Sequence, residues 1–284
     1  MLEMSMTPFQ EIKRALSGKI PSHLIDDLPN SWEKIGDVLI IILPKELEKY
    51  KLIISEKYAE ILNCKSVLRN IGGIIGELRE PKVQYIYGDK DTVTIHMENG
   101  IRYKLDPQKV MFSSGNMDER IRMSSISNKS ETVVDLFAGI GYFTLPMAVY
   151  SKPNLIYACE KNRIAYNYLC ENVVLNKVID KVHTLFGDNR NVAPVNIADR
   201  VIMGYIGDTS KFLKTALLCL KDCRGVIHFH EKYPEKYVPD KPLMEIQKIA
   251  DEFDRSAKFI NSKKVKSYAP GIGHFVFDIR FDDK

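Results

Sequence analysis

The second half of the chain alternates short apolar runs with stretches of helical spacing. Alternation of this kind predicts a doubly wound parallel sheet with helices between consecutive strands. Two later runs, residues 258–265 and 274–281, alternate apolar and polar positions and predict an antiparallel hairpin at the sheet edge. The expected parallel strands are residues 132–137, 154–159, 181–186, 199–203 and 225–229.

The first part of the chain has a different pattern. Residues 38–43 form an unbroken apolar run, which predicts a strand buried on both faces. Asn99-Gly100 separates two alternating runs and tolerates positive φ, so we expect a tight hairpin there. We therefore predict a small α+β domain over residues 18–108, preceded by an N-terminal extension of residues 1–17. A connecting segment, residues 109–130, would lead to the α/β domain of residues 131–284.

The composition is that of an ordinary globular protein. Of 284 residues, 45% are hydrophobic and 27% are charged, and the net charge of +4 permits an anionic partner without demanding one. The first residues lack a long apolar core and the longest apolar run is too short to span a bilayer, so we expect no signal peptide and no membrane segment. Five cysteines without a CxxC pair are typical of a reducing cytoplasm, and no zinc spacing is present. We therefore expect a cytoplasmic protein without a metal site.

The first apolar run of the predicted α/β domain ends in a glycine turn. Asp135 is followed by Gly139 and Gly141, and residues without a Cβ let a ligand approach backbone N–H groups. The next expected strand ends at Glu160, about 25 residues further along the chain. A carboxylate at this position can accept hydrogen bonds from both ribose hydroxyls of a nucleotide-like ligand.

The third and fourth strand ends carry further candidates. Asp188 and Asn189 can read an adenine edge, and residues 203–205 (MGY) follow the fourth strand. Each residue alone is typical of a surface cap, but four consecutive strand ends favour a ligand, because open α/β sheets bind ligands there. A complete GxGxxG signature is absent and the bulky Phe143 follows the turn, which argues against a dinucleotide. S-adenosylmethionine (AdoMet), which needs a ribose clamp and an adenine reader but no phosphate nest, fits better.

The sequence blocks DLFAGIGYF, ACEKN, GDN and DRVIMGYI together resemble those of AdoMet-dependent enzymes that modify tRNA beside the anticodon. Two branches share this framework. One contains the tRNA guanine N1-methyltransferases, and the other is the wybutosine-synthesising protein 2 family, which transfers the 3-amino-3-carboxypropyl group of AdoMet. The resemblance covers roughly residues 35–281. It implies an α/β, Rossmann-like class I AdoMet-dependent methyltransferase fold with a smaller N-terminal α+β domain that positions tRNA.

Two departures from the methyltransferase branch resemble the aminocarboxypropyl branch. The methyltransferases carry an Asn-Leu-Pro or Asn-Pro-Pro type sequence where this chain has MGYI, and an arginine where it has Gly115-Asn116. The resemblance therefore implies transfer to 4-demethylwyosine of phenylalanine tRNA, with release of methylthioadenosine. It also implies that residues 110–123, which alone read as a solvated linker helix, form a cofactor lid. The residues implied to bind AdoMet are Ser113, Arg120, Phe137, Gly139, Glu160, Asp188 and Asn189.

Other residues have open interpretations. Tyr205 can stack on a base or simply pack, and His230 can assist proton removal or be structural; both are candidate catalytic residues. Lys263, Lys264 and Lys266 can bind a phosphate backbone or form a solvated surface. Two alternative functions also stay open. One is a tRNA guanine N1-methyltransferase with an altered fourth-strand motif, and the other is a non-catalytic RNA-binding module without affinity for AdoMet.

Overall fold

The chain divides into two compact units. The computed structural model describes residues 6–284. One unit comprises the chain up to Met97 together with Tyr103–Phe112, and the other comprises Glu98–Arg102 and Ser113–Lys284. The chain therefore enters the second unit first with a short hairpin tip and finally at Ser113, within the segment that we predicted as a connection.

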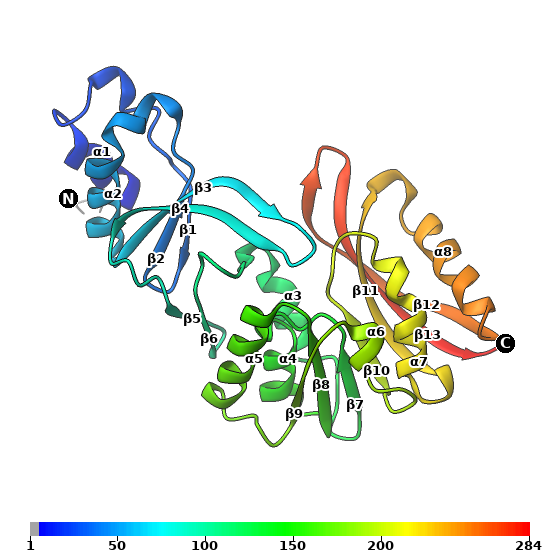
Figure 1. Ribbon diagram of the computed structural model, residues 1–284. Helices are drawn as coiled ribbons and strands as arrows, with labels where there is room; N and C mark the ends of the chain where they lie inside the picture. The colour runs from blue at the N-terminus through cyan, green and yellow to red at the C-terminus, as the bar shows by residue number, and fades with distance from the viewer. Residues whose placement is uncertain (1–5) are drawn as a thin grey trace, which may run out of the picture. The chain divides into compact units, whose positions relative to one another are not determined.

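The N-terminal unit is built on a four-stranded sheet in the order β1-β2-β3-β4 (Figure 1). The central pair, β2 and β3, is parallel, and the outer pairs are antiparallel. Strand β2 is the buried strand predicted at residues 38–43, although it ends at Ile41 and Ile42 is exposed. The elements of this sheet and its cover are β1 (Trp32–Ile35), β2 (Val38–Ile41), β3 (Ser66–Ile75), β4 (Glu80–Gly88), α1 (Pro8–Leu16), α2 (Lys51–Leu62), η1 (Ser22–Leu24) and η2 (Lys45–Tyr50).

Helix α1 packs into the core of this unit instead of forming the separate extension that we predicted. Thr7 caps the helix in a reciprocal pair with Gln10. Ile12 and Leu16, one turn apart on the same face, are completely buried together with Tyr58 of α2. Residues 1–5 of the predicted extension lie outside the described part of the chain.

A hairpin carries the chain from one unit to the other. Strands β5 (Thr94–Glu98) and β6 (Ile101–Leu105) pair as a two-stranded sheet. The predicted turn at Asn99-Gly100 is confirmed, with φ of +49° and +76° at its two residues. The tip, Glu98–Arg102, belongs to the second unit.

The second unit contains a seven-stranded sheet in the order β12-β13-β11-β10-β7-β8-β9. Strands β11, β10, β7, β8 and β9 run parallel, and β13 is antiparallel to both of its neighbours. The strand order reverses at β7 and β10, which places a ligand-binding crevice at their carboxyl ends. The strands are β7 (Thr132–Asp135), β8 (Leu155–Glu160), β9 (Val182–Phe186), β10 (Arg200–Met203), β11 (Gly225–Pro234), β12 (Arg255–Ala269) and β13 (Ile272–Asp283).

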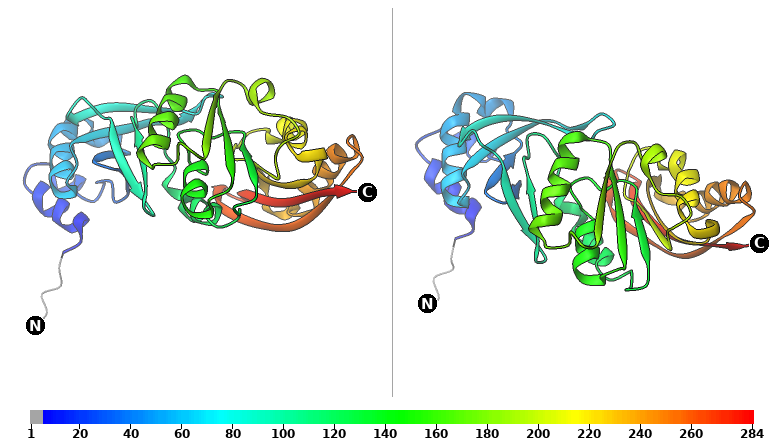
Figure 2. Two further views of the ribbon diagram at one scale, coloured as in Figure 1. Left: turned by 90° about the horizontal axis from the view of Figure 1, so that it is seen from below. Right: turned by 60° about the horizontal axis from the view of Figure 1, so that its bottom comes forward.

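Helices cover both faces of this sheet, so the predicted doubly wound architecture is confirmed. Figures 1 and 2 show α4 and α5 on one face and α7 and α8 on the other, with the long hairpin of β12 and β13 curving along the edge. The core beneath α7 and α8 joins them to the central strands, through Leu217, Ile246, Ile227 and Phe277 among others. The helices are α3 (Met117–Met123), α4 (Thr144–Pro146), α5 (Arg163–Leu175), α6 (Asn189–Val192), α7 (Leu213–Cys219) and α8 (Asp240–Asp251), with shorter turns η3 (Ser114–Asn116), η4 (Met147–Ser151), η5 (Thr209–Phe212), η6 (Lys221–Cys223) and η7 (Glu235–Tyr237).

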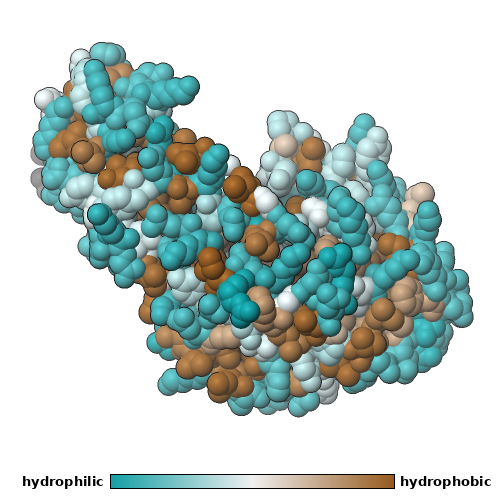
Figure 3. All heavy atoms as spheres, in the orientation of Figure 1, coloured by the Kyte–Doolittle hydropathy of each residue, from teal (hydrophilic) through white to brown (hydrophobic). Residues whose placement is uncertain are grey.

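Among residues 6–284, none of the helices is both long and apolar enough to cross a bilayer. Exposed apolar side chains on the N-terminal unit are interspersed with hydrophilic ones (Figure 3). A group of them, Ile71, Ile74, Ile75 and Leu78, lies on the hairpin of β3 and β4.

Candidate active site

Asp135 organises the turn that follows β7. Its Oδ1 accepts a hydrogen bond from the Phe137 N–H (3.1 Å), and its Oδ2 accepts one from the Thr144 hydroxyl (2.8 Å). Gly139 and Gly141 have φ of +58° and +103°, a region that glycine adopts without strain. Burial raises the pKa of Asp135 to about 6. The turn is therefore fixed from inside by one buried carboxyl group.

Glu160, the last residue of β8, reaches across to this turn. Its Oε2 accepts a hydrogen bond from the Gly139 N–H (2.8 Å), and its Oε1 accepts one from the Asn162 N–H (2.6 Å). Burial raises the pKa of the Glu160 carboxyl group. A carboxylate oxygen has two acceptor sites, so Glu160 retains the capacity to accept further hydrogen bonds. The predicted ribose clamp and the predicted glycine turn are thus joined directly.

Asp188 and Asn189 follow β9, but they face different partners. Asp188 binds the Arg190 guanidinium at two points (2.8 and 2.5 Å), which holds the pKa of Asp188 well below its usual range. Asn189 is buried and donates a hydrogen bond from its amide to the Leu136 carbonyl (2.9 Å). Its Oδ1 is buried and has no hydrogen-bond partner among the described residues. An unpaired buried acceptor marks a place for an N–H donor, and an adenine amino group is such a donor.

Ser113 and Arg120 form a second polar group at the start of the unit. The Arg120 guanidinium binds the two carboxylate oxygens of Glu98 (2.6 and 2.7 Å), and both side chains are almost completely buried. Arg120 also donates a hydrogen bond to the Ser113 carbonyl (2.8 Å), and the Ser113 hydroxyl accepts one from Lys266 (2.7 Å). The carboxylate that Arg120 binds is therefore supplied by the chain itself, at the hairpin tip. A direct contact of either residue with AdoMet stays a prediction.

Aromatic side chains occupy the other side of the glycine turn. The rings of Phe137 and Tyr205 are stacked, with centroids 5.0 Å apart and planes inclined by 15°, and Phe212 meets Phe137 edge-on at 5.0 Å. The loop after β10 is fixed at its far end, because Glu231 accepts a hydrogen bond from the Thr209 N–H (2.7 Å). Tyr205 is half-buried in this loop. The structure thus places the candidate Tyr205 beside the turn that carries Phe137.

His230, the second candidate catalytic residue, lies in the interior. It is 1% exposed, its Nδ1 lies 3.1 Å from Nε2 of His274, and its ring stacks on Phe143 at 5.2 Å. Its Nε2 is 3.8 Å from a Glu119 carboxylate oxygen. Burial, with His274 as a further cause, holds the pKa of His230 well below its usual value. This environment keeps the ring neutral and favours a structural role over proton exchange with a bound base.

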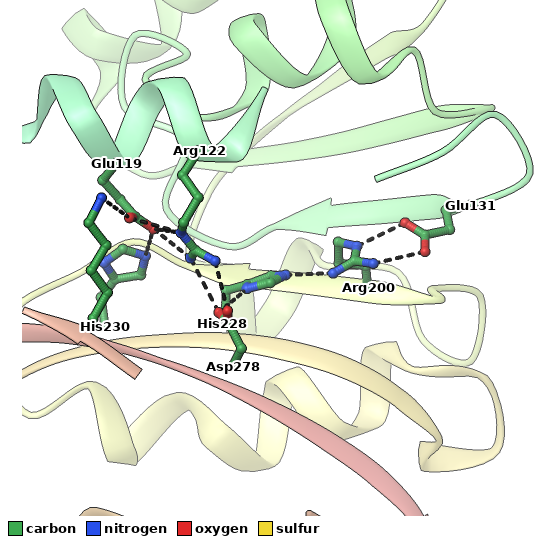
Figure 4. A network of polar contacts seen from close by, with 8 residues as sticks. Glu119, Arg122, Glu131, Arg200, His228, His230 and Asp278 are labelled. Atoms are coloured by element: carbon green, nitrogen blue, oxygen red, sulfur yellow. Dashed lines mark hydrogen bonds and ion pairs between the residues drawn. The ribbon is translucent and has the colours of Figure 1, made fainter. Parts of the chain in front are cut away.

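A line of buried and partly buried polar side chains runs from Glu131, just before β7, to Asp278 on β13 (Figure 4). Glu131 binds the Arg200 guanidinium at two points, and Arg200 Nη1 lies 2.7 Å from His228 Nε2. Because an arginine can only donate, His228 Nε2 must accept, and its Nδ1 therefore carries the proton toward Asp278 (2.5 Å). The network assigns His228 a single neutral tautomer.

The same network anchors α3. Arg122 on this helix binds Asp278 (2.7 Å) and Glu119 (2.6 Å), as Figure 4 shows. Glu119 has no exposed side-chain surface, and burial raises the pKa of its carboxyl group. Helix α3 also carries Arg120, so the ion pair of Arg122 with Asp278 on β13 fixes the position of the predicted lid segment against the sheet.

The predicted basic run lies on the edge strand β12, and its lysines have partners within the unit. Lys264 binds Glu235 (2.8 Å), Lys266 binds the Ser113 hydroxyl, and Lys263 is 4.0 Å from Glu119. No group of three His, Cys, Asp or Glu side chains among residues 6–284 is arranged to hold a metal ion.

The predicted site residues therefore fall into two groups, of which the larger lies around the turn after β7. Phe137, Gly139, Glu160, Asn189 and Tyr205 gather around the turn after β7 through the contacts above. The contacts of Ser113 and Arg120 lead instead to Glu98 and Lys266. No pattern in the sequence indicates the residues whose ion pairs and hydrogen bonds support the site. These residues are Glu98, Glu119, Arg122, Glu131, Arg200, His274 and Asp278.

A sheet of this order, with one antiparallel strand, a glycine turn after its first strand and a carboxylate at the end of the second, defines the class I AdoMet-dependent transferase fold. The chain belongs to the TRM5/TYW2 family. The TRM5/TYW2 methyltransferase domain matches residues 94–258, and the TYW2 N-terminal domain matches residues 12–92.

Similar proteins cover almost the whole chain. The tRNA(Phe) (4-demethylwyosine(37)-C(7)) aminocarboxypropyltransferase of Pyrococcus horikoshii is 46% identical over 269 residues, which are 95% of each chain. The crystal structure of P. horikoshii TYW2 in complex with MeSAdo has a TM-score of 0.87 at 42% identity and covers 97% of this chain and 100% of that one. The structure of M. jannaschii TYW2 in complex with AdoMet has a TM-score of 0.73 at 42% identity and covers 89% of this chain and 100% of that one.

Proposed function

We propose that this protein transfers the 3-amino-3-carboxypropyl group of AdoMet to C7 of 4-demethylwyosine, next to the anticodon of phenylalanine tRNA. The observation that carries the choice of reaction is the match of 46% identity over 95% of both chains to an enzyme of that name. The match of residues 12–92 to the TYW2 N-terminal domain supports the same branch of the family.

The residues around the glycine turn fit AdoMet as the donor substrate. Glu160 can accept hydrogen bonds from the two ribose hydroxyls, because its oxygens have unused acceptor sites. The unpaired Oδ1 of Asn189 can accept one from the adenine amino group. A Cβ on Gly139 would lie 2.3 Å from the Tyr142 ring, so this position has room only for hydrogen. A buried acceptor without a partner and a turn without side-chain bulk are what adenosine requires.

The chemistry depends on which carbon of the sulfonium faces the nucleophile. The bond from C7 of the base to Cγ of the methionine arm forms as the bond from Cγ to sulfur breaks. The electron pair stays on sulfur, methylthioadenosine leaves, and the proton on C7 is lost. The protein contributes orientation, because an in-line arrangement at roughly 3–3.5 Å lowers the barrier to the transfer. We assign the stacked Tyr205 to the acceptor base, on which its exposed side can stack.

In this proposal the two units bind different substrates. The second unit holds AdoMet, and the N-terminal unit positions the anticodon arm of tRNA. Residues 110–123 form the cofactor lid, which is anchored by Arg122 and supported by the Arg120–Glu98 pair. All five cysteines are free thiols, which supports the cytoplasm as the place of the reaction.

A second candidate function is supported by the similarity of the chain to tRNA methyltransferases. The tRNA (guanine(37)-N(1))-methyltransferase Trm5b of Pyrococcus abyssi is 36% identical over 262 residues, which are 92% of this chain and 78% of that protein. A methyltransferase would release S-adenosylhomocysteine instead of methylthioadenosine. A third possibility, a non-catalytic RNA-binding module, would not bind AdoMet.

Analysis of the nucleoside by-product distinguishes the three functions. Purified protein is incubated with AdoMet and tRNA that carries 4-demethylwyosine. The small products are then separated by chromatography and identified by their molecular masses. We expect methylthioadenosine in the same amount as modified tRNA. S-adenosylhomocysteine would support the methyltransferase, and no product together with no AdoMet binding would support the RNA-binding module. Glu252→Gln, at an exposed surface ion pair, is the control for handling of the protein.

A further inference from the structure

Gly204 follows β10 at the point where the acceptor must approach. The donor residues lie at the ends of β7, β8 and β9, so the neighbouring end of β10 is left for the acceptor. The φ of Gly204 does not require glycine, because it lies outside the left-handed region. A Cβ at this position would instead lie 2.7 Å from Cε2 and 2.9 Å from Cδ2 of Phe143. Glycine is required here by a neighbouring ring and not by the backbone.

Phe143 is itself supported from behind. It is 5% exposed and stacks on His230, with centroids 5.2 Å apart and planes inclined by 24°. His230 in turn contacts His274, with 3.1 Å between nitrogen atoms. Both histidines are 1% exposed, so neither can move aside without opening the core. The Phe143 ring therefore lies between the ring of His230 and the backbone of Gly204, and His274 contacts His230 on a tilted ring plane.

The rest of the loop is fixed at two further points. Tyr205 stacks on Phe137, and the Thr209 hydroxyl donates a hydrogen bond to the Tyr205 carbonyl (2.9 Å). Glu231 accepts a hydrogen bond from the Thr209 N–H. The loop of residues 204–209 is therefore held from the turn after β7 and from the end of β11. Among residues 6–284, the atoms nearest to the Cβ position of Gly204 belong to the ring of Phe143.

We propose that Phe143, backed by His230, is a positioning residue for group transfer: its ring fills the space beside Gly204 and fixes the β10 loop at the distance from the donor that the acceptor base requires. His230 acts through Phe143 and does not exchange protons with the substrate. The proposal rests on the proposed function, because it concerns the geometry of that transfer.

The pair Gly204 and Phe143 is tested with a double-mutant cycle. Gly204→Ala forces the ring and the loop apart, so we expect kcat for transfer to fall about 30-fold, since small misplacements at a reacting centre have effects of this size. The dissociation constant of AdoMet, measured by calorimetry, should change less than about two-fold, because the donor residues are untouched. In Gly204→Ala/Phe143→Leu the shorter side chain makes room, and kcat should recover at least about five-fold relative to Gly204→Ala.

Independent losses in the double variant would overturn the proposal, as would an unchanged kcat in Gly204→Ala. A wild-type protein that forms no methylthioadenosine would instead contradict the proposed function. The two failures are therefore distinguishable.

The supporting role of His230 is tested by substituting a side chain whose ring has no titratable nitrogen. His230→Phe retains an aromatic surface behind Phe143, so we expect kcat to stay within about five-fold of wild type with the same pH profile. His230→Ala removes that surface, and kcat should fall more than about ten-fold. Equal losses in the two variants, or the disappearance of a titration from the pH profile of His230→Phe, would show that His230 acts as a base and would overturn its assignment.

Discussion

The two sides of the site are built from different chemistry. On the donor side, at the ends of β8 and β9, Glu160 and Asn189 present acceptor atoms, one of which has no partner in the described chain. On the acceptor side, at the end of β10, stacked rings fix the loop of Tyr205. We therefore propose that donor recognition depends on individual polar atoms, whereas placement of the acceptor depends on packing. The predictions below separate these two kinds of dependence.

The largest effect is expected on the donor side. Glu160→Ala removes the carboxylate that joins the glycine turn to β8 and that we propose accepts hydrogen bonds from the ribose hydroxyls. Charge-assisted hydrogen bonds contribute about 1.5–3 kcal/mol each, so the dissociation constant of AdoMet should rise about 100-fold or more. Calorimetric titration with AdoMet measures it, with Glu252→Gln as the surface control. A change below about three-fold would place the ribose elsewhere.

A pH-dependent effect is expected at the base of the same turn. The Asp135 carboxyl group has a pKa of about 6 in the folded protein, compared with 3.8 in an unfolded chain. Between these values the folded state keeps a proton that the unfolded state has lost, so the stability contributed by this group is present at low pH and falls as the pH rises. The free energy of unfolding of wild type relative to Asp135→Asn should therefore fall by about 2 kcal/mol from about pH 4 to about pH 7.

Urea unfolding of both proteins at each pH measures this difference. If the difference in unfolding free energy between the two proteins stays constant or grows with pH, Asp135 is not protonated more readily in the folded state than in the unfolded state.

A smaller effect is expected on the acceptor side. Tyr205→Ala removes the ring that stacks on Phe137, and stacking of one base contributes about 1–3 kcal/mol, so kcat/KM for tRNA should fall about 20-fold. Tyr205→Phe keeps the ring and should lose no more than about three-fold. The affinity for AdoMet should be the same in both variants, because no donor residue is changed. An equal loss in Phe and Ala variants would mean that the hydroxyl, and not the ring, matters.

The sequence predicted the donor side far better than the acceptor side. The parallel strands could be predicted, and so could the convergence of Gly139, Glu160 and Asn189, because strand ends in an open α/β sheet converge and polar residues there have few other reasons to occur. The contact of these residues with AdoMet stays a prediction. The edge hairpin of β12 and β13 was readable from its alternation of polar and apolar residues. Such features depend on local pattern and on one general rule of topology.

The remaining features depend on contacts between distant parts of the chain. Glu98 lies in a turn signal, and nothing near it indicates a buried pair with Arg120, 22 residues later. His230 and Asp278 lie on neighbouring strands whose pairing no local pattern specifies. Gly204 looked like a departure from a motif, whereas the structure shows that Phe143 fills its side-chain space. Packing of this kind becomes visible only when the fold brings the residues together.

Isotopic labels show most directly whether the 3-amino-3-carboxypropyl group or the methyl group of AdoMet is transferred. Two AdoMet samples, one labelled in the methyl carbon and one in the carboxyl carbon, are incubated separately with the protein and tRNA carrying 4-demethylwyosine. The account predicts that the carboxyl label enters tRNA and that the methyl label stays in methylthioadenosine. Methyl label in tRNA, with the carboxyl label left in S-adenosylhomocysteine, would contradict it.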